Sequence, residues 1–188
     1  MAMNQQSVLY DVQQLKVYAF ATPDVVGGAS PTFSPGIICQ GVADITLTPT
    51  IQSTQLKGDG GRVISDLGRV EMFDCQATYG RLGLDAMAVM VGGITTDTGT
   101  GAAEQVVWSL AAPNLLPHFK VEFQIANTDN GVGGINVVLY NCTLKSATFI
   151  DSKTDAFGQP KFDVTAVPLL STGAIGEVIF DATLTPLD

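Results

Sequence analysis

The sequence has few charged residues for its length. Only 14% of its 188 residues are Asp, Glu, Lys or Arg, against roughly 25% in an ordinary soluble domain. A soluble monomer normally carries more charge, so we expect part of the surface to be buried against other chains. The 18 acidic residues outnumber the 9 basic ones and give a formal charge of −9. This excess of acidic residues argues against nucleic-acid binding through phosphate contacts.

Histidine and cysteine are also scarce, which excludes several kinds of site. His118 is the only histidine, and no serine lies in a Gly-x-Ser-x-Gly nucleophile context. The three cysteines, Cys39, Cys75 and Cys142, are far apart and fall in predicted strands. That usage is typical of buried thiols, not of a disulfide framework or a zinc site. We therefore expect no enzyme activity, no metal site and no cofactor.

Long apolar runs are missing as well. No run approaches 18 apolar residues, and no basic segment followed by an apolar segment opens the chain. We expect neither a membrane span nor an export signal.

The most informative stretch runs from Arg69 to Gly93, because here the hydrophobic period changes from two to about 3.6. Residues 69–78 predict a strand, and the Tyr79-Gly80 pair breaks it. A helix is predicted from residue 81 to 91, with Gly92-Gly93 as its C-terminal stop. Its apolar positions recur at i, i+4, i+7 and i+8, the spacing of one helical face: Leu82, Ala86, Val89 and Met90.

Elsewhere the pattern favours strands and loops. Short alternating segments predict strands at 13–21, 37–48, 50–57, 104–111, 119–125, 135–149, 161–170 and 177–184. Hairpin turns are predicted at 58–61 and 127–134. Residues 1–11 are polar and predict a flexible N-terminal arm, and 22–36 and 92–103 predict long loops. We expect a single domain, 1–188, that is mainly β, built as a sandwich or partly closed barrel of two packed sheets with one flanking α-helix.

Two segments carry a resemblance to a known family. They are GDGGRVISDLGRVEMFDCQATYG, which precedes the helix, and VVLYNCTLKSATFIDSKTDAFGQPKFDVTAVPL near the end. Together they are similar to the major tail tube proteins of long-tailed bacteriophages. The resemblance lies in the order of elements from Thr50 onward and does not extend to the N-terminal third.

The resemblance implies a structural virion protein with a tail tube-like fold. Its copies would close into hexameric rings that stack into a tube, and DNA would pass through the lumen without specific binding. The implied partners are other copies of the chain, a tape measure protein and tail terminator or initiator proteins. The implied location is the virion tail, with assembly in the host cytoplasm. An acidic balance suits a lumen wall that must not hold DNA.

Some charged residues are candidates for roles in such a tube. Asp44, Glu71 and Asp74 are candidates for the lumen, because they lie on the predicted strands before the helix. The alternative is that they face solvent or form ordinary salt bridges. Basic residues around the central strand and helix are candidates for the subunit interface: Lys57, Arg62, Arg69 and Arg81.

Two other functions remain open from the residues alone. One is a β-sandwich carbohydrate- or receptor-binding module of a phage or cell surface, with a ligand cleft near Trp108 or Tyr140. The other is an acidic hydrolase, which would need a close carboxylate pair such as Asp44 with Asp74.

Overall fold

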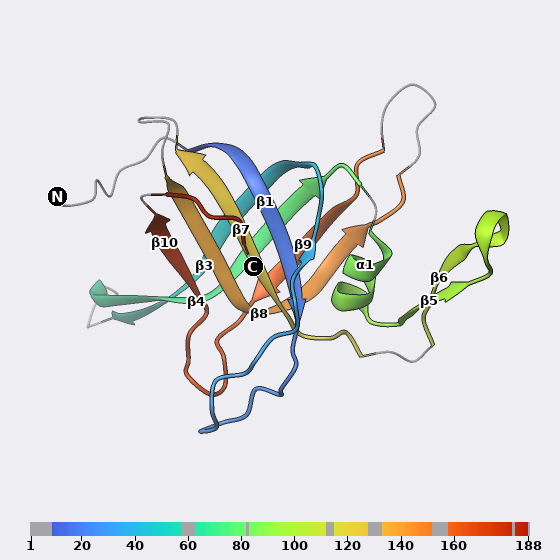
Figure 1. Ribbon diagram of the computed structural model, residues 1–188. Helices are drawn as coiled ribbons and strands as arrows, with labels where there is room; N and C mark the ends of the chain where they lie inside the picture. Colours follow the sequence, from blue (N-terminus) through green and yellow to red (C-terminus); the bar gives the residue numbers. More distant parts are fainter. Residues whose placement is uncertain are drawn as a thin grey trace.

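The computed structural model describes residues 9–57, 63–81, 83–111, 115–127, 133–151, 158–181 and 183–187 (Figure 1). The early elements are β1 (Leu9–Ala19), β2 (Ile37–Ile38), β3 (Val42–Lys57), β4 (Val63–Tyr79), α1 (Leu84–Val91) and β5 (Ile94–Thr98). After a 3₁₀ turn at Gly101–Ala103 come β6 (Gln105–Ser109), β7 (Phe119–Asn127), β8 (Gly134–Thr148), β9 (Lys161–Ala166) and β10 (Gly176–Asp181).

Eight of these strands form one antiparallel sheet in the order β2-β1-β7-β8-β9-β4-β3, with β10 added beside β8. The length of β8 explains the branch. Its first half, Gly134 to Leu139, pairs with β10, and its second half, Cys142 to Thr148, pairs with β9. Strands β5 and β6 form a separate two-stranded sheet.

The large sheet curls on itself, so that its two ends nearly meet (Figure 1). Residues between β2 and β3 bridge the gap. The backbone N–H of Cys39 donates to the carbonyl of Leu15 in β1 at 2.8 Å, and the N–H of Gly80 donates to the carbonyl of Gln40 at 3.1 Å. Gly41 follows with φ 71°, the left-handed conformation that lets the chain turn into β3.

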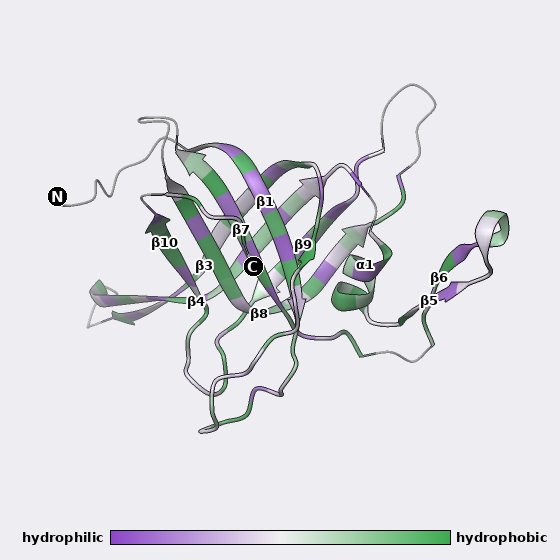
Figure 2. Cartoon of the chain, in the orientation of Figure 1, coloured by the Kyte–Doolittle hydropathy of each residue, from purple (hydrophilic) through white to green (hydrophobic). Residues whose placement is uncertain are grey.

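The core fills the inside of this curled sheet. Alternate residues of five strands point inward and are buried, and they include Leu15, Cys75, Phe119, Leu139 and Val164. The same alternation of polar and apolar residues along the strands is visible in Figure 2. The first half of β8 is covered on both sides, because the adjacent residues Val137 and Val138 are both buried.

Helix α1 flanks the barrel and contributes one apolar face to the core. Ala86, Val89 and Met90 are buried, as the helical spacing predicted, whereas Leu82 lies outside the described residues. The helix ends at Gly92, whose φ of 90° confirms the predicted glycine stop. The predicted fold class, a mainly β domain with one flanking helix, is confirmed. The two layers of the barrel are halves of one sheet, and the second sheet is a small separate ribbon.

The C-terminal tail, residues 183–187, lies across the outer face of β1 and β7. The buried Lys16 ammonium donates to the Leu187 carbonyl at 2.6 Å, and the Leu187 N–H donates to Gln14 Oε1 at 3.0 Å. Gln124 Nε2 donates to the Thr185 carbonyl at 2.7 Å. The tail therefore covers this face of the barrel.

Several expectations about element boundaries are wrong. The strand predicted at 69–78 begins at Val63, and the strand predicted at 161–170 ends at Ala166. Strands predicted at 37–48 and 50–57 are the short β2 and the long, continuous β3, which passes through Pro49. Proline is tolerated there because β3 is the edge of the sheet and pairs only with β4. The arm predicted at 1–11 overlaps β1, which begins at Leu9; residues 1–8 lie outside the described residues. The loop predicted at 92–103 contains strand β5, because its β-branched threonines favour extended pairing with β6.

The other predicted loop, 22–36, has no regular strand but is tied to the body. Phe20 and Phe33 form an isolated β-bridge across its base, with ring centroids 4.9 Å apart. Asp24 accepts hydrogen bonds from the backbone N–H groups of Leu170 and Ser171. Contacts within the chain already order this loop.

Candidate assembly surfaces

The most exposed part of the sheet is the far end of the β3–β4 hairpin. Among the described residues, strand β4 pairs with β9 from Phe73 to Thr78, and beyond Phe73 no third strand joins the hairpin in that part of the chain. The hairpin arm, as we call residues 51–57 and 63–70, projects away from the barrel (Figure 1). The side chains of residues 51–57, 63 and 65–70 are all exposed.

Apolar side chains lie on both faces of the hairpin arm. Leu67 is 73% exposed and Leu56 is 62% exposed, and the register Thr54↔Leu67 and Leu56↔Ser65 puts them on one face as diagonal neighbours. Ile51 and Val70 lie directly opposite each other on the other face and are also exposed. Apolar residues of the arm stand out in Figure 2.

This arrangement is unfavourable for an isolated molecule. A two-stranded hairpin is at best marginally stable in water without a third strand or a covering layer. Exposed apolar surface with free strand edges is typical of a surface that pairs with another chain. The hairpin arm is therefore suited to docking on a protein partner.

A second projecting element is the ribbon, the name used below for residues 94–109 with strands β5 and β6. Its base is fixed by Trp108, whose indole N–H donates to the Gly92 carbonyl at 3.0 Å. Gly93 is required beside this contact because a Cβ there would lie 2.5 Å from the Ser109 carbonyl oxygen. Beyond the base, Ile94 and Val107 are exposed apolar residues.

The outer face of β3, β4 and β9 is polar and is the third notable surface. Asp44 is exposed on it, and Asp74 lies on the same face because the register pairs Asp44 with Thr78 and Asp74 with Thr48. A cavity of about 290 Å³ opens on this face, lined by Asp44, Gln76, Ala77, Thr78, Ser146, Ala147, Thr148, Lys161, Phe162 and Asp163.

The two aspartates do not form a carboxylate pair. Four residues separate them along the strands, which is about 13 Å at the usual strand rise. Asp74 instead accepts hydrogen bonds from Thr165 Oγ1 at 2.9 Å and Thr50 Oγ1 at 3.2 Å, with Lys145 Nζ at 3.6 Å. The Thr165 hydrogen bond is the main reason that the pKa of Asp74 lies below its usual value.

Glu71 does not follow the regular alternation of side chains that places Asp74 on the outer face of β4. The ladder pairs Met72 with Thr50 and Val70 with Ile51, so Glu71 is an extra residue at a β-bulge. Its carboxylate accepts a hydrogen bond from Arg69 at 2.9 Å. The bulge marks the point where the hairpin arm leaves the barrel.

The basic candidates do not form one cluster. Lys57 lies at the far end of the arm, opposite Val63, whereas Arg81 follows the other end of β4, about 60 Å away measured along an extended strand of this length. Arg69 is exposed within the arm and contacts Glu71, and Arg81 donates to Gln40 Oε1 at 2.8 Å. Arg62 lies outside the described residues, as does the predicted turn at 58–61.

The aromatic residues suggested for a ligand cleft have different surroundings. Trp108 fixes the base of the ribbon through its hydrogen bond to Gly92. Tyr140, in β8, lines a cavity of about 300 Å³ together with Phe33, Leu169 and Glu177. Nothing in this geometry joins Trp108 and Tyr140 into one stacking platform.

Two further searches cover the described residues. Within them, no group of three or more His, Cys, Asp or Glu side chains is arranged to hold a metal ion. No helix in the same part of the chain has the length and apolar character needed to cross a membrane.

The hairpin arm was not predicted as a surface, and residues 92–103, which include part of the ribbon, were predicted only as a long loop suited to contacts between rings. The sequence does show the apolar residues that mark the arm as a surface, which are Leu56, Leu67 and Val70. What the sequence lacks is any indication that β9 stops pairing at Phe73.

Comparisons with known proteins find no match in sequence and a weak similarity in structure. No protein-family model matches the sequence, and no curated protein matches it. Among solved structures, the chain is similar to the anti-feeding prophage cap, described as the AFP tube terminating cap. That match has 9% sequence identity and a TM-score of 0.43, and it covers 94% of this chain and 96% of the other.

Proposed function

We propose that this protein is a structural subunit of a phage tail tube, and that copies of it close into hexameric rings that stack around a lumen. The family resemblance in the sequence suggests this assignment. The observation that carries it is the hairpin arm, a long two-stranded extension with exposed apolar residues on both faces.

A tube subunit accounts for the hairpin arm in physical terms. In a ring, the arm would gain a neighbouring layer, bury its leucines and satisfy the free edge of β3. The low proportion of charged residues has the same explanation, because much of a tube subunit's surface lies against other copies.

The lumen would be lined by the polar outer face of β3, β4 and β9. The C-terminal tail covers the outer face of β1 and β7, which leaves this face as the open one. Asp44, Asp74 and Asp163 on it outnumber Lys145 and Lys161, and threonines lie between them. Such a wall would repel the phosphates of DNA weakly and would hold none of them. Glu71, at the bulge, would lie at the rim of this face.

The same proposal sets the partners and the location. The protein would work without catalysis, in the virion tail, after assembly in the host cytoplasm. Its partners would be other copies of itself, a tape measure protein and the proteins that start and end the tail.

Sedimentation velocity over a concentration series tests this function. A tube subunit should pass from monomer to large assemblies above a critical concentration. A carbohydrate- or receptor-binding module should stay a monomer or small oligomer at every concentration, which would contradict the proposal. Deletion of Met1 to Ser7, which leaves β1 whole, tests whether the N-terminal residues take part in assembly; a tube subunit that uses them should show a raised critical concentration.

A further inference from the structure

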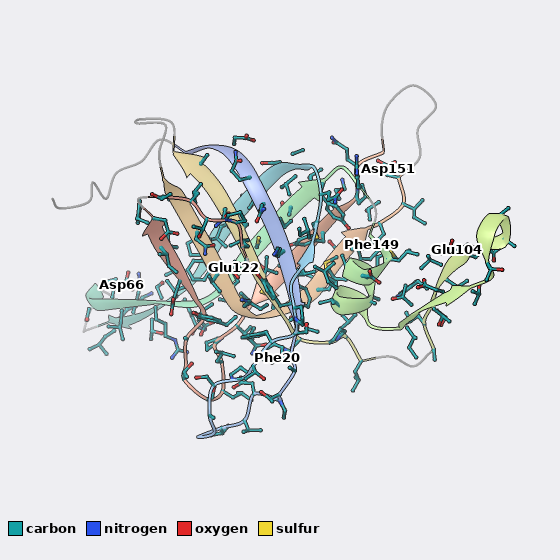
Figure 3. The ribbon with its side chains drawn as sticks, viewed as in Figure 1. Phe20, Asp66, Glu104, Glu122, Phe149 and Asp151 are labelled. Carbon is teal, nitrogen blue, oxygen red and sulfur yellow. The ribbon has the colours of Figure 1, made fainter. Side chains whose placement is uncertain are left out.

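The hairpin arm and the ribbon leave the barrel on opposite sides of the molecule (Figure 1). Asp66 on the arm and Glu104 on the ribbon mark the two ends in Figure 3. Because they lie at opposite ends, the arm cannot reach the ribbon of its own chain. Each element is a two-stranded sheet without a covering layer, so each leaves exposed apolar residues.

Each of the two elements carries a diagonal pair of exposed apolar residues on one face. On the arm, Leu56 and Leu67 are diagonal neighbours on one face. On the ribbon, the pairs Ile94↔Ser109 and Thr96↔Val107 make Ile94 and Val107 diagonal neighbours on one face as well. Diagonal pairs in antiparallel sheets are about 7–8 Å apart. Two pairs with this geometry can stack face to face and bury each other.

The charges of the two elements are complementary. Within the arm, residues 51–57 and 63–70, Lys57 and Arg69 stand against Asp66, a net charge of 2 − 1 = +1, with Arg69 also paired to Glu71 at the bulge. Residues 94–109 contain only Asp97 and Glu104, a net charge of −2. In a chain with a formal charge of −9, a segment with a positive balance is unusual. Opposite charges on the two elements favour their contact over arm-to-arm or ribbon-to-ribbon contact.

We infer that the hairpin arm of one copy packs on the ribbon of a second copy. This contact is heterologous, because it joins different surfaces of identical chains, and such contacts generate rings or filaments instead of closed pairs. The inference rests on the proposed function and adds to it the two surfaces that meet between neighbouring subunits.

A mixing experiment with two variants tests the inference. The arm variant is Leu56→Asp with Leu67→Asp, and the ribbon variant is Ile94→Asp with Val107→Asp. All four side chains are exposed, so both variants should fold. The fluorescence of Trp108, the single tryptophan, reports whether the base of the ribbon is intact. Ile150→Asp, another exposed apolar residue, is the matched control and should assemble like the unsubstituted chain.

Each variant alone should sediment as a monomer at concentrations where the unsubstituted chain assembles. The equimolar mixture should sediment at twice the monomer mass and no higher, because only one intact arm and one intact ribbon can meet. Assembly of the ribbon variant alone, whether into dimers or large particles, would overturn the inference and leave the proposed function standing. So would a mixture that stays monomeric. Monomers of the unsubstituted chain at every concentration would overturn both.

A second experiment reverses charges on the two elements, and it tests their contact without changing any apolar residue. Asp97→Lys with Glu104→Lys should raise the critical concentration at least tenfold at low salt. Adding Lys57→Glu and Arg69→Glu to the same chain should restore assembly. Failure of the fourfold variant to assemble better than the twofold one would contradict the charge pairing.

Discussion

Replacing two leucines of the hairpin arm should weaken assembly without weakening the subunit. The change is Leu56→Ser with Leu67→Ser. Both side chains are mostly exposed in the single chain, at 62% and 73%, so their loss removes almost no packing from the monomer. Docking of the arm on a neighbouring copy can bury the exposed surface of both leucine side chains.

The magnitude follows from that exposure. Full burial of a leucine side chain is worth about 1.5–3 kcal/mol. With roughly two thirds to three quarters of each side chain left to bury, each leucine offers about 1–2 kcal/mol and the pair about 2–4 kcal/mol. Since about 1.4 kcal/mol corresponds to a tenfold change in an association constant, the critical concentration should rise about 30- to 700-fold.

The assay combines sedimentation with thermal unfolding. Pelleting over a concentration series gives the critical concentration, and circular dichroism gives the melting temperature of the monomer. Ile150→Ser is the control, because it removes a side chain of similar size and exposure outside the arm. An unchanged critical concentration in the double variant would show that the arm's leucines stay in solvent after assembly, which would contradict docking through the arm.

Three further predictions concern the subunit itself. Tyr79→Phe should leave the stability unchanged or raise it by up to about 1 kcal/mol, because the buried Tyr79 hydroxyl has no hydrogen-bond partner among the described residues; a clear loss in chemical denaturation would contradict this. Asp74→Asn should cost about 1 kcal/mol at neutral pH. Because the folded pKa of Asp74 is lowered, this stabilisation is present above the unfolded pKa of about 3.9 and is lost as the pH falls through the folded value. The difference from the unsubstituted chain should therefore vanish in strong acid; a loss of stability from Asp74→Asn that does not change with pH would count against it. Finally, burial raises the pKa of the Cys39 and Cys75 thiols to about 12 and also raises that of Cys142. All three should resist a thiol reagent at pH 8 until the protein unfolds, and rapid labelling of the native protein would contradict the buried positions.

The fold class could be predicted from the sequence because local patterns determine it. The apolar spacing around Ala86, Val89 and Met90 fixes the one helix, and Gly92 ends it. The alternation in residues 119–125 and 161–166 fixes two strands of the barrel wall. These are short-range signals, each readable within a window of about ten residues.

The boundaries and surfaces depend on contacts between distant segments, so local patterns did not determine them. Pro49 suggested a break, but its position on an edge strand allows β3 to continue. The tract after Gly93 looked like a loop, but pairing with β6 makes part of it a strand. The arm became visible only when β9 was seen to stop pairing at Phe73. Lys57 and Arg81 were grouped because both lie around the central strand and helix in the sequence. In the structure they lie at opposite ends of β4, so they do not form one cluster.

The most direct test of the central claim is negative-stain electron microscopy of the purified protein above its critical concentration. Hollow tubes should appear in side view, and six-fold rings with an open centre in end view. A field of compact single particles at the highest attainable concentration would contradict the central claim.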